Sequence, residues 1–158
     1  RIKLMNTTQQ EIQIVTFTLD DQEFGLNILE VQEINKLTTV TKIPNSAGYI
    51  EGIINLRNKI IPIINLKKRM QFDNVDNIND KTARIIVVNI NETIVGFIVD
   101  SVSEVLRISQ ETVEPLPDLI NNVKSEYVKG VIRYNDRLLI LIDLKKIIQE
   151  DQEQLLLE

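Results

Sequence analysis

The chain of 158 residues contains an internal repeat, and the repeat restricts the possible folds more than any other feature of the sequence. The earlier part of the match recurs 71 positions later, at Gly25/Gly96, Val31/Val102, Glu33/Glu104, Ile34/Val105 and Pro44/Pro115. The later part recurs 78 positions later, at Tyr49/Tyr127, Gly52/Gly130, Lys59/Arg137, Leu66/Leu144, Lys67/Lys145 and Lys68/Lys146. An ordered set of matches of this kind indicates two homologous halves.

The composition favours β-strands within each half. The chain has 26 Ile and 14 Val but only 2 Ala, and β-branched side chains pack well on a pleated surface and lose rotamer freedom in a helix. Apolar and polar residues alternate over residues 15–28 with a turn at 20–22, and again over 86–98 with a turn at 91–92. Each half is therefore predicted to begin with a β-hairpin.

The remaining elements follow the same repeat. A third strand precedes a second hairpin, which spans residues 53–64 in one half and 131–142 in the other. Asn65 and Asp143 then precede short helices, because their side chains can accept hydrogen bonds from the first free amides of a helix. A further helix is expected at the C-terminus, where leucines follow an acidic segment.

Five short strands per half predict an all-β protein of two small barrels, since closure hides the edges of an open sheet. We expect residues 1–11 to be an N-terminal tail, 12–80 the first barrel, and 81–158 the second barrel with the C-terminal helix.

Several classes of function are disfavoured. The chain has no Cys and no His, which excludes thiolate or imidazole metal ligands and any catalytic relay that uses these side chains. No P-loop or GxGxxG motif occurs, so we expect no nucleotide cofactor and no metal. A formal charge of −5 repels polyphosphate and anionic membranes. No apolar run is long enough for a membrane helix and no signal peptide is evident, so a cytoplasmic protein is expected.

Binding through surfaces is the function that these exclusions leave as the default. The alternative from a different class is a small β-barrel that binds RNA, which the basic run Lys67, Lys68 and Arg69 would favour. The repeat-related Lys145 and Lys146 indicate instead that the basic run is a solvated helix start. Only 4% of the residues are aromatic, so few side chains could stack on bases. An unrecognised hydrolase is a third alternative.

Positions where the two halves differ are less well explained by the barrel fold alone. Arg57 corresponds to Asn135 in a turn that favours short polar side chains, and Asn58 can supply that turn chemistry, which would leave the Arg57 guanidinium free. We predict that Arg57 makes a charge-assisted contact with Glu33. An exposed Arg without a role is an equally simple interpretation. The insertion of residues 116–122 carries three apolar side chains, which would pack either on the barrel or on a partner.

These residues resemble the family of chemotaxis coupling proteins, the CheW family. The resemblance is carried by residues 25–34, 43–44, 49–57 and 60–66 in the first half, and by 96–105, Pro115, 127–130 and 138–144 in the second. It covers about residues 12 to 150. Asn58 stands where the family commonly has Gly, and Asn65 where it has Asp, and both changes preserve the local turn and cap chemistry.

The resemblance implies two SH3-like five-stranded barrels and a non-enzymatic adaptor. Such an adaptor tethers the histidine kinase CheA, through its CheW-like regulatory domain, to the cytoplasmic hairpin tips of methyl-accepting chemoreceptors within membrane-associated arrays. By motif position, the receptor-facing residues would be Val31, Gly52, Arg57, Val102 and Val105. Those facing the kinase would be Glu33, Ile34 and Leu119. For the valines a place in the core, and for Gly52 a purely backbone role, are the alternatives.

Overall fold

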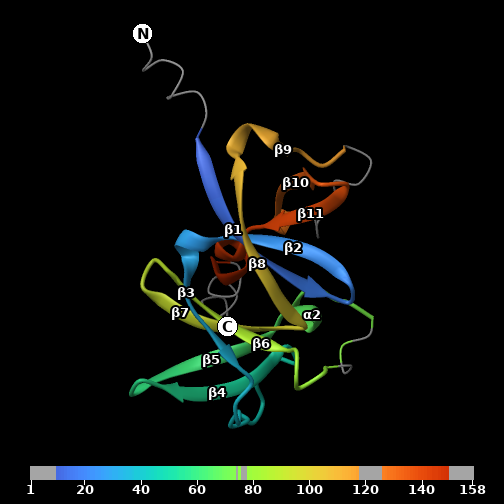
Figure 1. Cartoon of the computed structure of the whole chain (residues 1–158). Helices are drawn as coiled ribbons and strands as arrows, with labels where there is room; N and C mark the ends of the chain where they lie inside the picture. The colour runs from blue at the N-terminus through green and yellow to red at the C-terminus, as the bar shows by residue number, and fades with distance from the viewer. Residues whose placement is uncertain (1–9, 74, 76–77, 118–125, 150–158) are drawn as a thin grey trace. The chain divides into compact units, whose positions relative to one another are not determined.

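A computed structural model describes residues 10–73, 75, 78–117 and 126–149 of the chain (Figure 1). Its strands form two sheets, and the protein is mostly β, as the sequence predicts. The strands are β1 (Glu11–Leu19), β2 (Gln22–Asn27), β3 (Val31–Lys36), β4 (Ile50–Leu56), β5 (Lys59–Asn65), β6 (Arg84–Ile90), β7 (Thr93–Val99), β8 (Ser101–Ser109), β9 (Val113–Glu114), β10 (Val128–Tyr134) and β11 (Arg137–Ile142). Short 3-10 segments cover Ile28–Glu30 and Gln110–Thr112.

Four two-residue turns connect the hairpins, and each contains two consecutive non-glycine residues with positive φ. The pairs are Asp20 and Asp21, Arg57 and Asn58, Asn91 and Glu92, and Asn135 and Asp136. Two consecutive positive φ angles match the right-handed twist of the flanking strands, and Asn and Asp tolerate them better than other residues that carry a Cβ. The predicted hairpins and their turn positions are confirmed.

The two halves exchange their first hairpins. One sheet has the order β8-β1-β2-β11-β10-β9, and the other has the order β3-β6-β7-β5-β4. The hairpin β1–β2 of the first half therefore lies between strands of the second half, while β6–β7 of the second half lies between strands of the first. This arrangement differs from the consecutive division at residue 80 expected from the sequence.

Apart from residues 17–19, 22 and 101–103, the compact units follow the two sheets and not the order of the sequence. The described residues of Arg1–Thr16, Glu23–Ile28 and Glu104–Glu158 form unit 1, and those of Phe17–Gln22 and Leu29–Ser103 form unit 2. The physical reason is that the halves are repeats. A hairpin offers the same pleat and the same row of hydrogen-bonding groups to the strands of either half, so the apolar pattern alone does not say which strands it joins.

The strand register shows that the repeat is a structural one. Parallel pairing places Leu141 of β11 opposite Gly25 of β2, and Ile63 of β5 opposite Gly96 of β7. These two pairs are related by the sequence repeat. A Cβ on Gly25 would lie 2.9 Å from Ile14 Cδ1, and one on Gly96 would lie 2.6 Å from Ile63 Cδ1. Both glycines therefore permit close packing inside a barrel.

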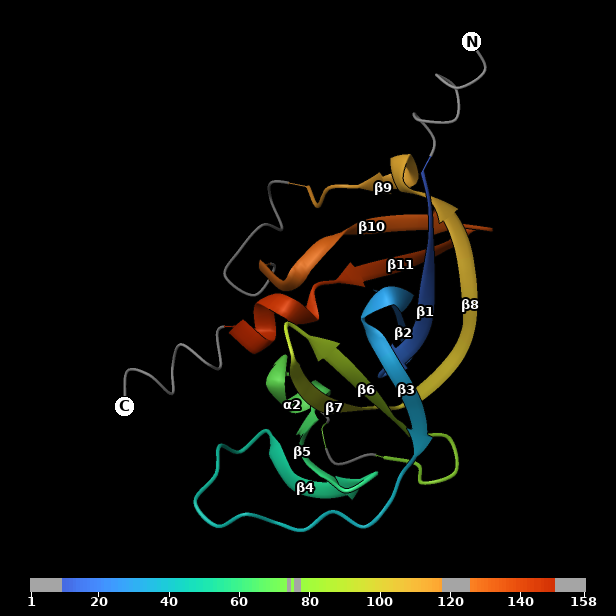
Figure 2. The same cartoon turned by 90° about the vertical axis from the view of Figure 1, so that its left-hand side faces the viewer.

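Each sheet closes where a segment after its third strand returns to the opposite edge. In unit 2, Thr41 forms an isolated bridge with Ile53 of β4, and in unit 1, Glu114 of β9 pairs with Val131 of β10. Figure 2 shows β9 along β10. Ile53 and Val131 are related by the repeat, so both units close on the same position of the repeated fourth strand.

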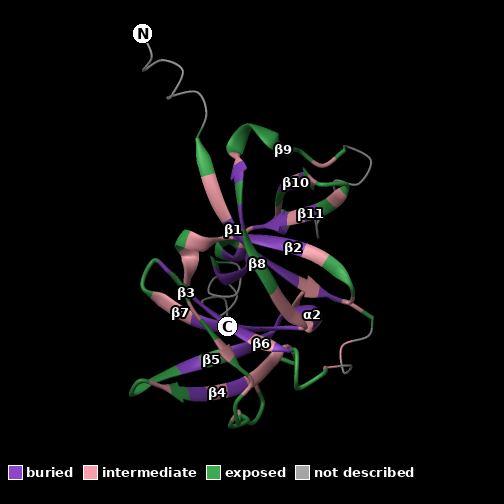
Figure 3. Ribbon diagram, viewed as in Figure 1, coloured by how far each residue is buried: buried purple, intermediate pink, exposed green. Residues whose placement is uncertain are grey.

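An aliphatic cluster of buried residues lies in each unit. Figure 3 colours the buried residues of the strands purple. The cluster of unit 1 consists of Ile14, Leu106, Ile108, Ile132, Leu139 and Leu141. The cluster of unit 2 consists of Ile54, Ile61, Ile63, Ile85, Val87 and Ile98. Burial of these side chains drives the closure of each barrel.

The predicted helix starts are both present. Helix α2 (Leu66–Arg69) is capped by Asn65, whose Oδ1 accepts a hydrogen bond from the Lys68 amide at 3.2 Å. Residues 144–149 are helical, and Asp143 Oδ1 accepts from the Lys146 amide at 3.3 Å. The predicted helix over residues 150–158 lies outside the described residues, as does most of the predicted N-terminal tail.

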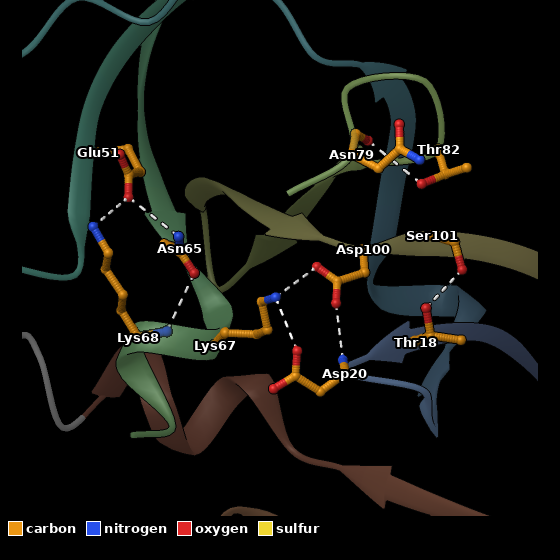
Figure 4. Close-up of polar contacts among 10 residues, drawn as sticks. All are labelled: Thr18, Asp20, Glu51, Asn65, Lys67, Lys68, Asn79, Thr82, Asp100 and Ser101. Atoms are coloured by element: carbon orange, nitrogen blue, oxygen red, sulfur yellow. Dashed lines mark hydrogen bonds and ion pairs between the residues drawn. The ribbon is translucent and has the colours of Figure 1, made fainter. Parts of the chain in front are cut away.

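The cap at Asn65 uses its amide group as well. Its Nδ2 donates to Glu51 Oε1 at 3.2 Å (Figure 4). An ionised aspartate in place of Asn65 could not make this bond, because a carboxylate has no hydrogen to donate. Asn65 is buried, and the repeat places Lys129 where the first half has Glu51. The amide of Asn65 therefore suits the acidic Glu51, whereas the carboxylate of Asp143 belongs to the half in which the equivalent residue is the basic Lys129.

We predict that Asn65→Asp lowers the free energy of unfolding by about 1–2 kcal/mol at neutral pH, because the new carboxylate loses the bond to Glu51 and repels it. Chemical denaturation measures the loss. The matched control is Asp143→Asn, which keeps the cap and should change stability by less than about 0.5 kcal/mol. Equal losses in the two variants would contradict the role of Glu51.

Candidate functional site

Arg57 and Glu33 form an ion pair at the end of the unit 2 barrel. Arg57 lies in the turn between β4 and β5, and Glu33 lies on β3, with 3.2 Å between Arg57 Nε and Glu33 Oε2. The side chain of Arg57 is 77% exposed and that of Glu33 is 19% exposed. The contact with Glu33 that the sequence suggested for Arg57 is therefore present, and it links the two edge strands of the sheet.

The backbone of Arg57 is strained. Its φ is 52°, so Arg57 occupies the first positive-φ position of the turn itself. Asn58 occupies the second positive-φ position, as expected, but the expectation that it would leave Arg57 beside the turn is wrong. The left-handed region costs roughly 1 kcal/mol for a residue with a long side chain, and Asn135 fills the equivalent position of the other turn at lower cost. Barrel closure by itself gives no reason for an arginine here.

In unit 1 an arginine also pairs with Glu104, the repeat counterpart of Glu33, but this arginine is not the counterpart of Arg57. Arg137 Nη2 donates to Glu104 Oε2 at 3.1 Å, and Arg137 Nε lies 3.1 Å from Glu23 Oε1. The hydrogen bond to Glu104 and the two negative charges raise the pKa of Arg137. Arg137 follows its turn, whereas Arg57 lies within one. An Arg–Glu pair is thus common to both barrels, and its placement in the turn is particular to unit 2.

Exposed aliphatic side chains accompany these ion pairs in both units. Ile34 and Ile60 of unit 2 are 39% and 70% exposed, and Val105 and Leu138 of unit 1 are 51% and 64% exposed. Ile34 and Val105 are related by the repeat, as are Ile60 and Leu138. Each barrel therefore presents an aliphatic residue on its third strand and another on its fifth.

Gly52 has a structural role that is independent of any partner. It is buried at a β-bulge with φ of 146°, and a Cβ there would overlap the carbonyl oxygen of Thr41 at the closure of the barrel. A Cβ on Gly130 would lie 2.6 Å from the carbonyl oxygen of Glu114 at the closure of unit 1. The backbone interpretation therefore accounts for both glycines.

The structure locates the other predicted positions as follows. Val31 on β3 and Val102 on β8 are half-buried, so each side chain is partly available to solvent. Val105 and Ile34 are exposed. Leu119 lies outside the described residues. Arg57 and Glu33, which the family resemblance assigns to different partners, are joined in one ion pair.

Sequence reasoning missed a buried cation in unit 2. Lys67 at the start of α2 has a side chain only 2% exposed, and its Nζ lies 3.1 Å from Asp20 Oδ1 and 3.1 Å from Asp100 Oδ1 (Figure 4). The amide of Asp20 also donates to Asp100 Oδ2 at 2.8 Å. The basic run had indicated a solvated helix start, which holds for exposed Lys145 but is wrong for Lys67. The one available signal was that Asp100 has an apolar counterpart, Leu29.

Burial lowers the pKa of Lys67, but its hydrogen bonds to Asp100 and Asp20 and their charges outweigh this effect, so the pKa is raised above its ordinary value of 10.5. The group is therefore a fixed charge at neutral pH that ties the β1–β2 turn to α2 and to the end of β7.

Neither a metal site nor a membrane span is evident in the part of the chain that the structure describes. No group of three or more His, Cys, Asp or Glu side chains could hold a metal ion among these residues. Among them, no helix has the length and apolar character needed to cross a membrane. The fold and its exposed edges define a duplicated SH3-like double-barrel protein.

Comparison with known proteins identifies the family. The model of the CheW-like domain matches residues 13–152, so the chain belongs to the CheW-like family. Chemotaxis protein CheW of Treponema pallidum (strain Nichols) is 34% identical over 152 residues, covering 95% of this chain and 89% of that protein. Chemotaxis protein CheW of Klebsiella aerogenes is 37% identical over 146 residues, covering 92% and 86%.

A solved structure agrees with these relatives. The crystal structure of scaffolding protein TtCheW from Thermoanaerobacter tengcongensis matches with a TM-score of 0.78 and 40% sequence identity. The match covers 85% of this chain and 90% of that chain. The family that the sequence motifs indicated is therefore confirmed.

We predict that Lys67→Met lowers the free energy of unfolding by about 1–3 kcal/mol at neutral pH, because Asp20 and Asp100 lose their counter-charge while solvent still reaches part of each carboxylate. A group with a raised pKa stabilises the fold fully below its unfolded pKa, and this stabilisation is lost as the pH rises through the folded pKa. The difference in the free energy of unfolding between wild type and Lys67→Met should therefore become smaller only above about pH 10.5.

Denaturation curves recorded across this pH range measure the difference. Lys145→Met changes the exposed repeat-related lysine and should alter stability by less than about 0.5 kcal/mol. A constant difference between wild type and Lys67→Met up to strongly alkaline pH would contradict the charge argument, because only the packing of the lysine stem would then account for it.

Proposed function

We propose that this protein is a non-enzymatic adaptor that couples the cytoplasmic tips of chemoreceptors to the histidine kinase CheA in signalling arrays. The observation that carries the proposal is the CheW-like match over residues 13–152, together with relatives named chemotaxis proteins and a solved relative named a scaffolding protein. The absence of Cys and His from the sequence supports a role in binding over catalysis. An adaptor of receptor arrays would act in the cytoplasm next to the membrane.

The proposed receptor-facing residues are Val31, Gly52, Arg57, Val102 and Val105. Arg57 supports this assignment best, since it is exposed and occupies a strained backbone position where the fold does not require an arginine. Gly52 would contribute indirectly, by letting the barrel close on β4, the strand that leads to the turn with Arg57. The partly exposed valines would supply apolar contact area.

The proposed kinase-facing residues are Glu33, Ile34 and Leu119. Ile34 is exposed and follows Glu33 on the edge strand β3, so the strand presents the apolar side chain and the charge on opposite faces. Because Glu33 holds Arg57, the kinase-facing and receptor-facing residues share an ion pair. A partner that displaces Glu33 would also release Arg57. Modest contacts of this kind gain strength when several are made at once in an array.

Reconstitution tests the proposed function directly. We expect that adding this protein to membranes with chemoreceptors and CheA makes kinase autophosphorylation sensitive to attractant, and that the protein sediments with both partners. The measurement is incorporation of labelled phosphate with and without attractant. Failure to sediment with either partner would reject the adaptor function.

We predict that Arg57→Asn weakens coupling at least tenfold and leaves the melting temperature unchanged or slightly raised. Asn is the residue of the equivalent turn and relieves the positive-φ strain, whereas the exposed ion pair it removes contributes about 0.2–1 kcal/mol. The measurements are receptor-dependent kinase activation and thermal unfolding.

The matched control is Arg133→Asn, which removes another exposed arginine, 76% exposed and 3.1 Å from Glu114, and should leave coupling intact. If Arg57→Asn lowers the melting temperature as strongly as it lowers coupling, Arg57 is a structural residue and the assignment to the receptor fails.

A further inference from the structure

The strand order makes each half of the chain dependent on the other for a closed barrel. In unit 1, β2 is hydrogen-bonded in parallel to β11, and in unit 2, β7 is hydrogen-bonded in parallel to β5. Every strand that flanks the hairpin β6–β7 comes from the first half, since its neighbours are β3 and β5. The neighbours of β1–β2 are β8 and β11, both from the second half.

The two hairpins are interior strands of their sheets, so removing one half of the chain removes more than an edge strand from each sheet. The sheet of unit 2 without β6 and β7 would leave β3 separated from β5, and the core cluster would lose Ile85, Val87 and Ile98. The first half alone therefore exposes Ile54, Ile61 and Ile63. Apolar burial on this scale is what makes a small barrel stable.

The two hairpin sites are equivalent in register as well as in order. Gly25 lies opposite Leu141 and Gly96 lies opposite Ile63, and these pairs coincide under the sequence repeat. The single chain thus has the topology of two repeats that have exchanged hairpins, the arrangement in which identical segments are swapped between protomers.

We propose that the two halves of this chain are binding partners of each other, held together without need of their covalent connection, and that a half from a second copy can replace its counterpart. The connection runs through residues 70–83, between α2 and β6, and Asp80 and Lys81 within it are exposed. This proposal does not depend on the proposed function, because it concerns which strands complete each barrel.

Cleavage of the folded full chain tests the proposal. A recognition sequence for a specific protease is inserted between Asp80 and Lys81, and the purified protein is cleaved under native conditions. The two pieces should elute together from a sizing column with the mass of the intact chain, with an unchanged circular dichroism spectrum. Two separately eluting folded pieces, or precipitation of a protein that was soluble before cleavage, would overturn the proposal.

Exchange between copies is measured on the same material. Cleaved protein with a fluorescent label on the second half is mixed with unlabelled cleaved protein that carries an affinity tag on the first half, and both are unfolded in urea and refolded together. Label should be recovered with the tag in proportion to the mixing ratio. Refolded, soluble protein from which no label is recovered would show that a half cannot be replaced.

A matched pair of variants ties the association to the strand pairing. Gly96→Ala puts a Cβ against Ile63 Cδ1 and Ile85 Cγ2 where β7 meets β5, and should weaken association of the cleaved halves roughly tenfold or more. Gly48→Ala meets no atom within 4 Å and should leave association unchanged. Equal association of the two cleaved variants would contradict the role assigned to this pairing.

Discussion

The parallel pairing of the second strand of one half with the fifth strand of the other is the interaction on which both barrels depend. It brings β2 to β11 and β7 to β5, and in each case a glycine on the second strand lies opposite a large aliphatic residue. The close approach allows the aliphatic side chains of both strands to fill one small core. Once this pairing is made, the segment after the third strand can reach the opposite edge and close the sheet.

The internal repeat separates what the fold requires from what it tolerates. Closure glycines, hairpin turns, helix caps and an Arg–Glu pair occur in both halves, so the barrel accounts for them. Arg57 differs from its counterpart, Asn135, and the barrel does not need this difference. In the other barrel Arg137 pairs with Glu104 from a position without positive φ. A costly backbone conformation that the fold could avoid points to a demand from outside the barrel.

Much of this was predictable because it depends on local chemistry. The period-2 pattern and the turn residues defined the hairpins, Asn65 and Asp143 identified the helix starts, and the contact of Arg57 with Glu33 was anticipated. The exchange of hairpins was not predictable, since repeated halves offer equivalent partners. The burial of Lys67 was missed because it depends on Asp20 and Asp100, which are distant in sequence from Lys67.

The exposed aliphatic residues bear on the same distinction between fold and function. Ile34, Ile60 and Val105 could be explained by the preference of β-branched residues for strands, so exposure alone says little about them. Leu138 lacks that preference, is 64% exposed, and gains little from folding at such a position. Leu138 is the counterpart of Ile60, so an exposed apolar side chain recurs at this position in both barrels without a contribution to either core, which agrees with the proposed role in binding a partner.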